Sequence, residues 1–158
     1  MKLIAHRGNI FGPNKSQENK REYLEEAIAK GYDVEIDLWK DDQYFYLGHD
    51  EPQNQISIMW LVHNKNNLWI HCKNFKALES MSNIPIDFNY FWHENDKHTL
   101  TSKGYIWSYP GQPYNLKSII VMPEKNDLLK FYCNDIITDA KDYNCFGICS
   151  DYVSKIII

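Results

Sequence analysis

Acidic side chains alternate with apolar ones along residues 32–39, YDVEIDLW. Successive side chains on a β-strand point to opposite faces, so Asp33, Glu35 and Asp37 share one face of this stretch. Neighbouring buried acids repel each other and lose hydration, which a bound cation offsets. The pattern is therefore consistent with a metal site on a buried strand, or with an edge strand that shows its polar face to water.

Two histidines and an arginine supply the other groups that phosphodiester chemistry needs. Imidazole titrates near neutral pH, so His6 and His49 can act as a general acid and base pair, one protonated and one neutral. Arg7 offers a fork of donors suited to phosphate. A hard cation such as Mg²⁺ or Ca²⁺ on Glu35 and Asp37 would complete the set that in-line displacement requires.

The alternation of apolar residues predicts the elements that position these groups. Strands are expected at residues 2–6, 32–39, 44–49, 68–73, 88–93, 105–109, 118–122 and 146–150. Helices are expected from a Ser16 N-cap to Gly31, at 56–64 and at 75–81. The ionisable residues of the first four strands fall on one face, near the carboxyl ends: His6, Glu35, Asp37, His49, His71 and Lys73. In parallel barrels that end carries the active site.

Eight strands with interspersed helices predict an α/β fold, a compact, helix-depleted (β/α)8 barrel of the TIM type. A full barrel takes about 250 residues, so several connections, such as 110–117, must be bare loops. Nothing marks a linker or a repeat, and we expect a single domain over residues 1–158.

Composition narrows the class of partner and the compartment. A net charge of −4 and a pI near 5.8 give no basic field for nucleic acid. The first apolar run is too short for a signal peptide, and no stretch is long enough to span a membrane, so a cytoplasmic protein is expected. The cysteines lack zinc or disulfide spacing, which predicts reduced, buried thiols at Cys72, Cys133, Cys145 and Cys149.

Four short motifs in the first third of the chain resemble the glycerophosphodiester phosphodiesterase family, within the phosphatidylinositol phospholipase C-like superfamily. They are HRG at 6–8, EN at 18–19, ExD at 35–37 and HD at 49–50, in the family's order. The stretch 70–73, IHCK, aligns more weakly with the family's ExK strand, and 148–152 is similar to its last-strand pattern.

The resemblance implies a role for each matching residue. His6 and His49 would be the acid and base, Arg7 and Lys73 would bind the substrate phosphate, Glu35 and Asp37 would bind the metal, and Glu18 and Asn19 would support the loop behind them. A substrate hydroxyl next to the phosphoester would attack phosphorus, and water would later open the cyclic phosphate.

His71 departs from the family pattern, because the family usually has a third carboxylate ligand there. As a ligand, neutral imidazole would leave one less negative charge and favour Mn²⁺ or Zn²⁺ over Ca²⁺. Alternatively Glu124 completes the ligand set, or metal affinity and activity are lost.

The sequence thus predicts a metal-dependent hydrolase of lipid metabolism that cleaves a small glycerophosphodiester or another polyol phosphodiester. An aromatic mouth would suit a glycerol or sugar moiety: Trp39, Trp92, Trp107 and Tyr109. His63, His93 and His98 are interpreted as structural histidines, and Asp151 and Glu124 as acids that solvated loops can also explain. Two alternatives stay open, a lyase that stops at the cyclic phosphate and a domain that binds phosphorylated ligands without turnover.

Overall fold

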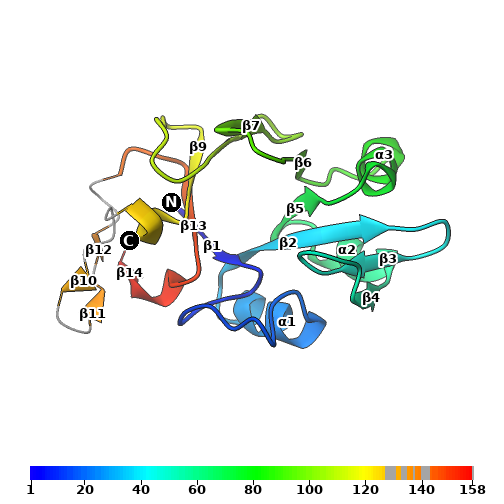
Figure 1. Ribbon diagram of the computed structural model, residues 1–158, viewed down its shortest axis with the longest axis horizontal. Coiled ribbons are helices and arrows are strands. Elements are labelled where there is room, and N and C mark those ends of the chain that lie inside the picture. Colours follow the sequence, from blue (N-terminus) through cyan, green and yellow to red (C-terminus); the bar gives the residue numbers. More distant parts are fainter. Residues whose placement is uncertain (127–130, 133–134, 137, 140–142, 158) are drawn as a thin grey trace.

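A computed structural model of the chain describes residues 1–126, 131–132, 135–136, 138–139 and 143–157 (Figure 1). The strands are β1 Lys2–His6, β2 Asp33–Lys40, β3 Phe45–Leu47, β4 Asn54–Ile56, β5 Leu68–Cys72, β6 Tyr90–Trp92, β7 His98–Leu100, β8 Ile106–Ser108, β9 Ser118–Val121, β10 Phe131–Tyr132, β11 Asp135–Ile136, β12 Thr138–Asp139, β13 Gly147–Ser150 and β14 Ile156–Ile157. The helices are α1 Arg21–Ala29, α2 Ile58–Asn64 and α3 Phe75–Asn83, with 3₁₀ turns η1 Pro123–Asn126 and η3 Val153–Lys155. Cys133 lies outside the described residues; Cys72 and Cys149 are buried and Cys145 is half-buried, all as free thiols.

Ten of these strands form one mixed sheet, in which parallel neighbours run in the order β6-β5-β2-β1-β13-β9-β8. The antiparallel strands β3, β4 and β7 extend it. Because the parallel strands point the same way, their carboxyl ends share one edge, where ligands bind in sheets of this kind.

The predicted (β/α)8 barrel is wrong. The described part of the chain holds three short α-helices, all before residue 84, beside a mixed sheet of ten strands. A helix-surrounded barrel needs a helical crossover between each pair of strands, and the described residues after α3 connect the strands by loops and 3₁₀ turns instead (Figure 1). The described α-helices therefore pack on the part of the sheet that ends at β6, which α3 contacts.

The predicted third parallel strand is also wrong, because β3 pairs antiparallel with β2. The connection between them is a tight turn in which the Asp41 amide donates to the Tyr44 carbonyl (3.1 Å), and so short a link joins only antiparallel strands. The β3–β4 hairpin returns the chain to the carboxyl edge of β2, and His49 sits in the loop of that hairpin instead of at a parallel strand end.

Strand β2 is the centre of the sheet, pairing with β1, β3 and β5. Its apolar face, Val34, Ile36 and Leu38, lies in the core beneath α1 and α3. Its acidic face is buried as well, with Glu35 3% and Asp37 0% exposed. The edge-strand alternative, in which the acids face water, is thereby excluded.

The sheet is curled. The evidence is that strands which are not paired neighbours contact each other across its acidic face. The Phe91 ring of β6 lies 4.7 Å from the Trp107 ring of β8, and Trp69 of β5 lies 5.7 Å from Trp107. Hydrogen bonds from Thr99 Oγ1 to the Trp92 carbonyl and from the Ser102 amide to the Tyr90 carbonyl, both 2.8 Å, join the region of β7 to β6.

An apolar cluster supports the carboxyl edge from within this curl. It contains Ile4, Trp69, Phe91, Trp107 and Cys149. Each of these residues precedes by two positions a polar residue at the edge: His6, His71, His93, Tyr109 and Asp151. Since side chains two apart share a face, the cluster forms the floor on which the polar groups stand.

The start of α1 differs from the sequence prediction. The helix begins at Arg21 with Lys20 in the cap position, and Ser16 lies in the preceding turn. None of the described helices is both long and apolar enough to cross a membrane.

Candidate active site

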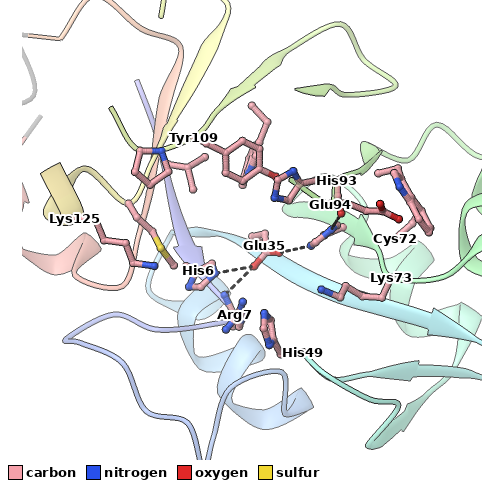
Figure 2. Close-up of a pocket in the computed structure, with 16 residues that line it drawn as sticks. His6, Arg7, Glu35, His49, Cys72, Lys73, His93, Glu94, Tyr109 and Lys125 are labelled. Atoms are coloured by element: carbon pink, nitrogen blue, oxygen red, sulfur yellow. Dashed lines mark hydrogen bonds and ion pairs between the residues drawn. The ribbon is translucent and has the colours of Figure 1, made fainter. Parts of the chain in front are cut away.

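A cavity of about 470 Å³ opens at the carboxyl edge of the parallel strands (Figure 2). One side, here called the charged wall, is formed by His6, Arg7, Glu35, His49 and Lys73. The other side, the aromatic wall, is formed by Trp92, His93, Trp107 and Tyr109. His71 also lines the cavity, and Lys125 and Glu94 stand at its margin. Groups that lie far apart in sequence thus share one enclosed space.

Arg7 is held by its own backbone as well as by its side chain. Its φ is +52°, in the left-handed region, and its amide donates to the Glu35 carbonyl (3.1 Å) and to Glu35 Oε2 (3.3 Å). Its Nη1 donates to Glu18 Oε2 at 3.2 Å. Its Nε lies 2.9 Å from Asp37 Oδ2 but at an angle unsuited to a hydrogen bond, so that contact is an ion pair.

Asp37 is the most heavily neutralised acid of the site. His71 Nδ1 lies 3.0 Å from Oδ1, Lys73 Nζ lies 3.6 Å from the same oxygen, and Asn19 Nδ2 donates to Oδ2 at 2.9 Å. Burial alone would raise the pKa of Asp37, but the His71 hydrogen bond and the charge of Arg7 lower it well below its usual range. Asp37 is therefore ionised at any ordinary pH.

Glu35 has the opposite balance of forces. Burial and the neighbouring charge of Asp37 raise the pKa of Glu35 above its usual value, although His6 and Arg7 oppose this. A bound cation would relieve both causes. Ligand atoms of Glu35, Asp37 and His71 lie within 4.8 Å of one another, a spacing that could hold a metal ion. Two carboxylate oxygens and an imidazole nitrogen are a donor set that divalent cations accept, so these residues fit a metal.

His6 belongs to a buried chain of hydrogen bonds that begins at the end of β13. Its Nδ1 lies 2.7 Å from Asp151 Oδ1, and because a carboxylate only accepts, Nδ1 carries the proton. Asp151 also accepts from Asn9 Nδ2 (2.8 Å), and its amide donates to Glu124 (3.0 Å). The interpretation of Asp151 as a solvated loop acid is wrong, since this residue is 7% exposed and fixes His6.

The two histidines of the charged wall differ in protonation. Burial lowers the pKa of His6, but the hydrogen bond with Asp151 and the charge of Glu35 outweigh it and raise the pKa above its ordinary value. Burial and the charge of Arg7 lower the pKa of His49. Near neutral pH, His49 is therefore the free base, and His6 holds its proton more strongly.

His49 is more exposed than His6 and is oriented by the next residue. Its Nδ1 lies 2.6 Å from Asp50 Oδ1. The loop that carries it is tightly packed: a Cβ at Gly48 would lie 2.1 Å from the Glu51 carbonyl oxygen, and Trp39 Nε1 donates to the Gly48 carbonyl. Trp39 therefore buttresses this loop and is not among the residues that line the cavity.

Glu18 and Asn19 lie behind the cavity lining. Glu18 accepts from Arg7 and, through Oε1, from Asn9 Nδ2 at 3.0 Å. Asn19, with φ +59°, makes two hydrogen bonds with Asp37. Its Nδ2 donates to the Asp37 carboxylate, and its Oδ1 accepts from the Asp37 amide at 3.0 Å. The two residues thus hold the arginine and the aspartate in place.

Glu124 is engaged away from the proposed metal ligands. It accepts from Ser150 Oγ and the Asp151 amide, both at 3.0 Å. It is not part of the Glu35, Asp37 and His71 group, so its role is to hold the loop that carries Asp151.

The aromatic wall contains a histidine that sequence reasoning treated as structural. His93 lines the cavity with its ring stacked on Tyr109, centroids 3.7 Å apart. Burial and the nearby His71 lower the pKa of His93 to about 4, and burial raises the pKa of Tyr109 well above its usual value. Both groups are uncharged at neutral pH. The sequence signal was available, because each stands two residues after a buried aromatic residue on its strand.

The site is therefore a cavity at the carboxyl edge of a parallel-centred sheet, with one charged and one uncharged wall. Comparisons with protein-family models, with curated proteins and with solved structures find no match to this chain.

Proposed function

We propose that the chain is a metal-dependent phosphodiesterase that hydrolyses a glycerophosphodiester or a similar polyol phosphodiester. The observation that carries the proposal is that His6 and His49 line one cavity, with the charge of Arg7 acting on both. Opposite pKa shifts on two such imidazoles are what an acid and base pair requires. The sequence motifs that resemble the glycerophosphodiester phosphodiesterases agree with this reading.

Arg7 and Lys73 supply positive charge for the phosphate. Both are about four-fifths buried, each is paired with Asp37, and both still line the cavity. A guanidinium and an ammonium that face a cavity stabilise the charge that builds on the non-bridging phosphate oxygens in the transition state. Glu18 and Asp37 keep Arg7 oriented, so less entropy is lost when the phosphate binds.

Proton transfer falls to the two histidines. Neutral His49 takes the proton from the polyol hydroxyl as its oxygen forms a bond to phosphorus, and protonated His6 gives its proton to the oxygen of the departing alcohol as that P–O bond breaks. Water then opens the cyclic phosphate with the roles reversed. Asp151 stabilises the imidazolium form of His6, as a carboxylate on Nδ1 does in other acid–base pairs.

Glu35, Asp37 and His71 would hold the metal. Mg²⁺ and Ca²⁺ suit the carboxylates, whereas the imidazole extends the choice to Mn²⁺ and Zn²⁺. The ion would supply Lewis-acid neutralisation of the phosphate charge.

The proposal is tested by assaying glycerophosphocholine, whose glycerol carries a hydroxyl next to the phosphoester, with each of these metals and with EDTA. Wild type should hydrolyse a diester only with metal, and His49→Ala should lower kcat by about 10²- to 10⁴-fold. The matched control is His63→Ala, which removes an exposed histidine of α2 and should keep wild-type activity. Equal rates in wild type and His49→Ala would refute the acid–base assignment.

A further inference from the structure

We infer that His93 and Tyr109 recognise the hydroxyl groups of the alcohol that stays on phosphorus, which makes the aromatic wall the determinant of substrate specificity. The inference rests on the proposed function of the charged wall. It starts from a feature that has no part in the proposed catalysis. Nδ1 of His93 is buried and has no hydrogen-bond partner among the described residues.

The cavity histidines share one orientation, in which Nδ1 faces an aspartate. The distances to the aspartate oxygen are 2.7 Å for His6 and Asp151, 2.6 Å for His49 and Asp50, 3.0 Å for His71 and Asp37, and 3.8 Å for His93 and Asp96. In a neutral imidazole, a carboxylate facing Nδ1 favours the tautomer with the proton on that atom and the lone pair on Nε2. His71 differs, because its Nε2 lies 3.2 Å from the His93 carbonyl oxygen. In the first three pairs the nitrogen and the oxygen lie within 3.0 Å of each other, so the aspartate holds the imidazole in position.

His93 has the same arrangement on the uncharged side. Its Nδ1 is buried and makes no hydrogen bond among the described residues, with Asp96 Oδ2 too distant at 3.8 Å. Asp96 is 59% exposed and accepts from the Glu94 amide at 3.4 Å. His93 lines the cavity, and with the proton on Nδ1 its Nε2 would accept a hydrogen bond from a ligand hydroxyl.

Ring stacking decides which ligand chemistry this wall takes. Tyr109 and His93 cover a face of each other at an interplanar angle of 22°, and Phe91 covers a face of His71 at 3°. A quaternary ammonium group binds to open ring faces. Here stacking occupies one face of each of these rings, and His93 and Tyr109 both line the cavity (Figure 2). An acceptor nitrogen and a phenol suit the hydroxyls of a polyol.

The positions of the walls fit a ligand that spans them. Figure 2 shows His93 and Tyr109 on one side of Glu35, and Arg7 and His49 on the other. A phosphate held at Arg7 and Lys73 would place its ester alcohol toward the aromatic wall. Glycerol or a sugar has hydroxyls close enough to phosphorus to reach it.

The test is calorimetric binding of three phosphate monoesters in the presence of Mg²⁺, which needs no turnover. Glycerol 3-phosphate carries the hydroxyls, ethyl phosphate lacks them, and phosphocholine replaces them with a quaternary ammonium. Wild type should bind glycerol 3-phosphate about fivefold more tightly than ethyl phosphate for each added hydrogen bond of ordinary strength. Tyr109→Phe and His93→Ala should bring that ratio close to one.

Asp96→Ala changes an exposed residue, so it tests the wall even if His93→Ala fails to fold. It should lower the ratio by weakening the His93 orientation, while leaving ethyl phosphate affinity unchanged. Tyr114→Phe is the control for loss of a tyrosine hydroxyl outside the cavity. A wild-type ratio of one, a preference for phosphocholine, or an unchanged ratio in Tyr109→Phe would overturn the inference. A preserved ratio in a protein without hydrolase activity would refute the proposed function alone.

Discussion

The two walls of the cavity come from different parts of the chain and carry different kinds of side chain. The charged wall is carried by β1, β2, β5 and the β3–β4 hairpin, all before residue 74, where helices flank the sheet. The aromatic wall is carried by β6, which α3 contacts, and by β8, which follows a loop and the short strand β7. The first wall is a network of buried ion pairs, and the second is a stack of rings. We propose that catalysis belongs to the charged wall and specificity to the aromatic wall, and the predictions below test this.

The largest effect is expected for Asp37→Asn. Arg7, His71 and Lys73 all face the Asp37 carboxylate, so its removal leaves the charges of Arg7 and Lys73 uncompensated. Loss of one partner of a buried ion pair costs about 3–5 kcal/mol, which urea unfolding in EDTA should detect. Tyr109→Phe, on the aromatic wall, should change the free energy of unfolding by less than about 0.5 kcal/mol. Similar losses in both variants would break the distinction between the walls.

Glu35→Gln should act in the opposite direction to Asp37→Asn when no metal is present. The raised pKa of Glu35 means that its ionised form destabilises the folded chain at neutral pH, so the amide should keep or increase stability in EDTA. A metal at 100 times its Kd should stabilise wild type by about 2.7 kcal/mol and the variant by much less. Thermal unfolding with and without metal measures both. Equal stabilisation of both proteins would exclude Glu35 as a ligand.

Asp151→Asn should have a smaller effect, centred on His6. Losing the charge of the hydrogen-bonded carboxylate should destabilise the fold by about 1.5 kcal/mol and lower activity about 10- to 100-fold. In metal-free protein, NMR titration should show a fall in the pKa of His6 with no change for His93. An unchanged His6 titration would contradict the assigned hydrogen bond.

The same variant should change how stability depends on pH. The raised pKa of His6 adds to the free energy of unfolding of wild type. This contribution is complete below pH 6.5 and is lost as pH rises through the pKa of His6 in the folded protein. The lowered pKa of Asp151 adds a second stabilising contribution. It is present above pH 3.8 and is lost as pH falls through the pKa of Asp151 in the folded protein. Both losses should shrink in Asp151→Asn, whereas His49→Ala should retain them.

The sequence predicted the charged wall better than the aromatic wall, and the reason is local. His6, Arg7, Glu35 and His49 lie in short motifs, and strand alternation placed them on one edge. Asp151 and His93 lie beyond residue 90, where no motif is strong. Their signal was the residue two positions earlier, Cys149 and Phe91, whose burial depends on contacts between distant strands.

The fold prediction failed where strand direction depends on the length of the connection. Most of the parallel strands were recognised from apolar runs, but β3 was assigned a parallel partner although a tight turn precedes it. The hairpin β7–β8 was missed for a different reason, because β7 is short and largely exposed. Counting strands gave a barrel, whereas connection lengths decide between a barrel and a mixed sheet.

The central claim is that the charged wall cleaves a phosphodiester with metal, His6 and His49. Phosphorus NMR of glycerophosphoglycerol incubated with wild type, His49→Ala and His63→Ala tests it most directly. The claim predicts that the diester signal is replaced by that of glycerol phosphate only with metal, in wild type and His63→Ala. A diester signal that persists in wild type under every divalent metal, or that disappears equally fast in His49→Ala, would contradict it.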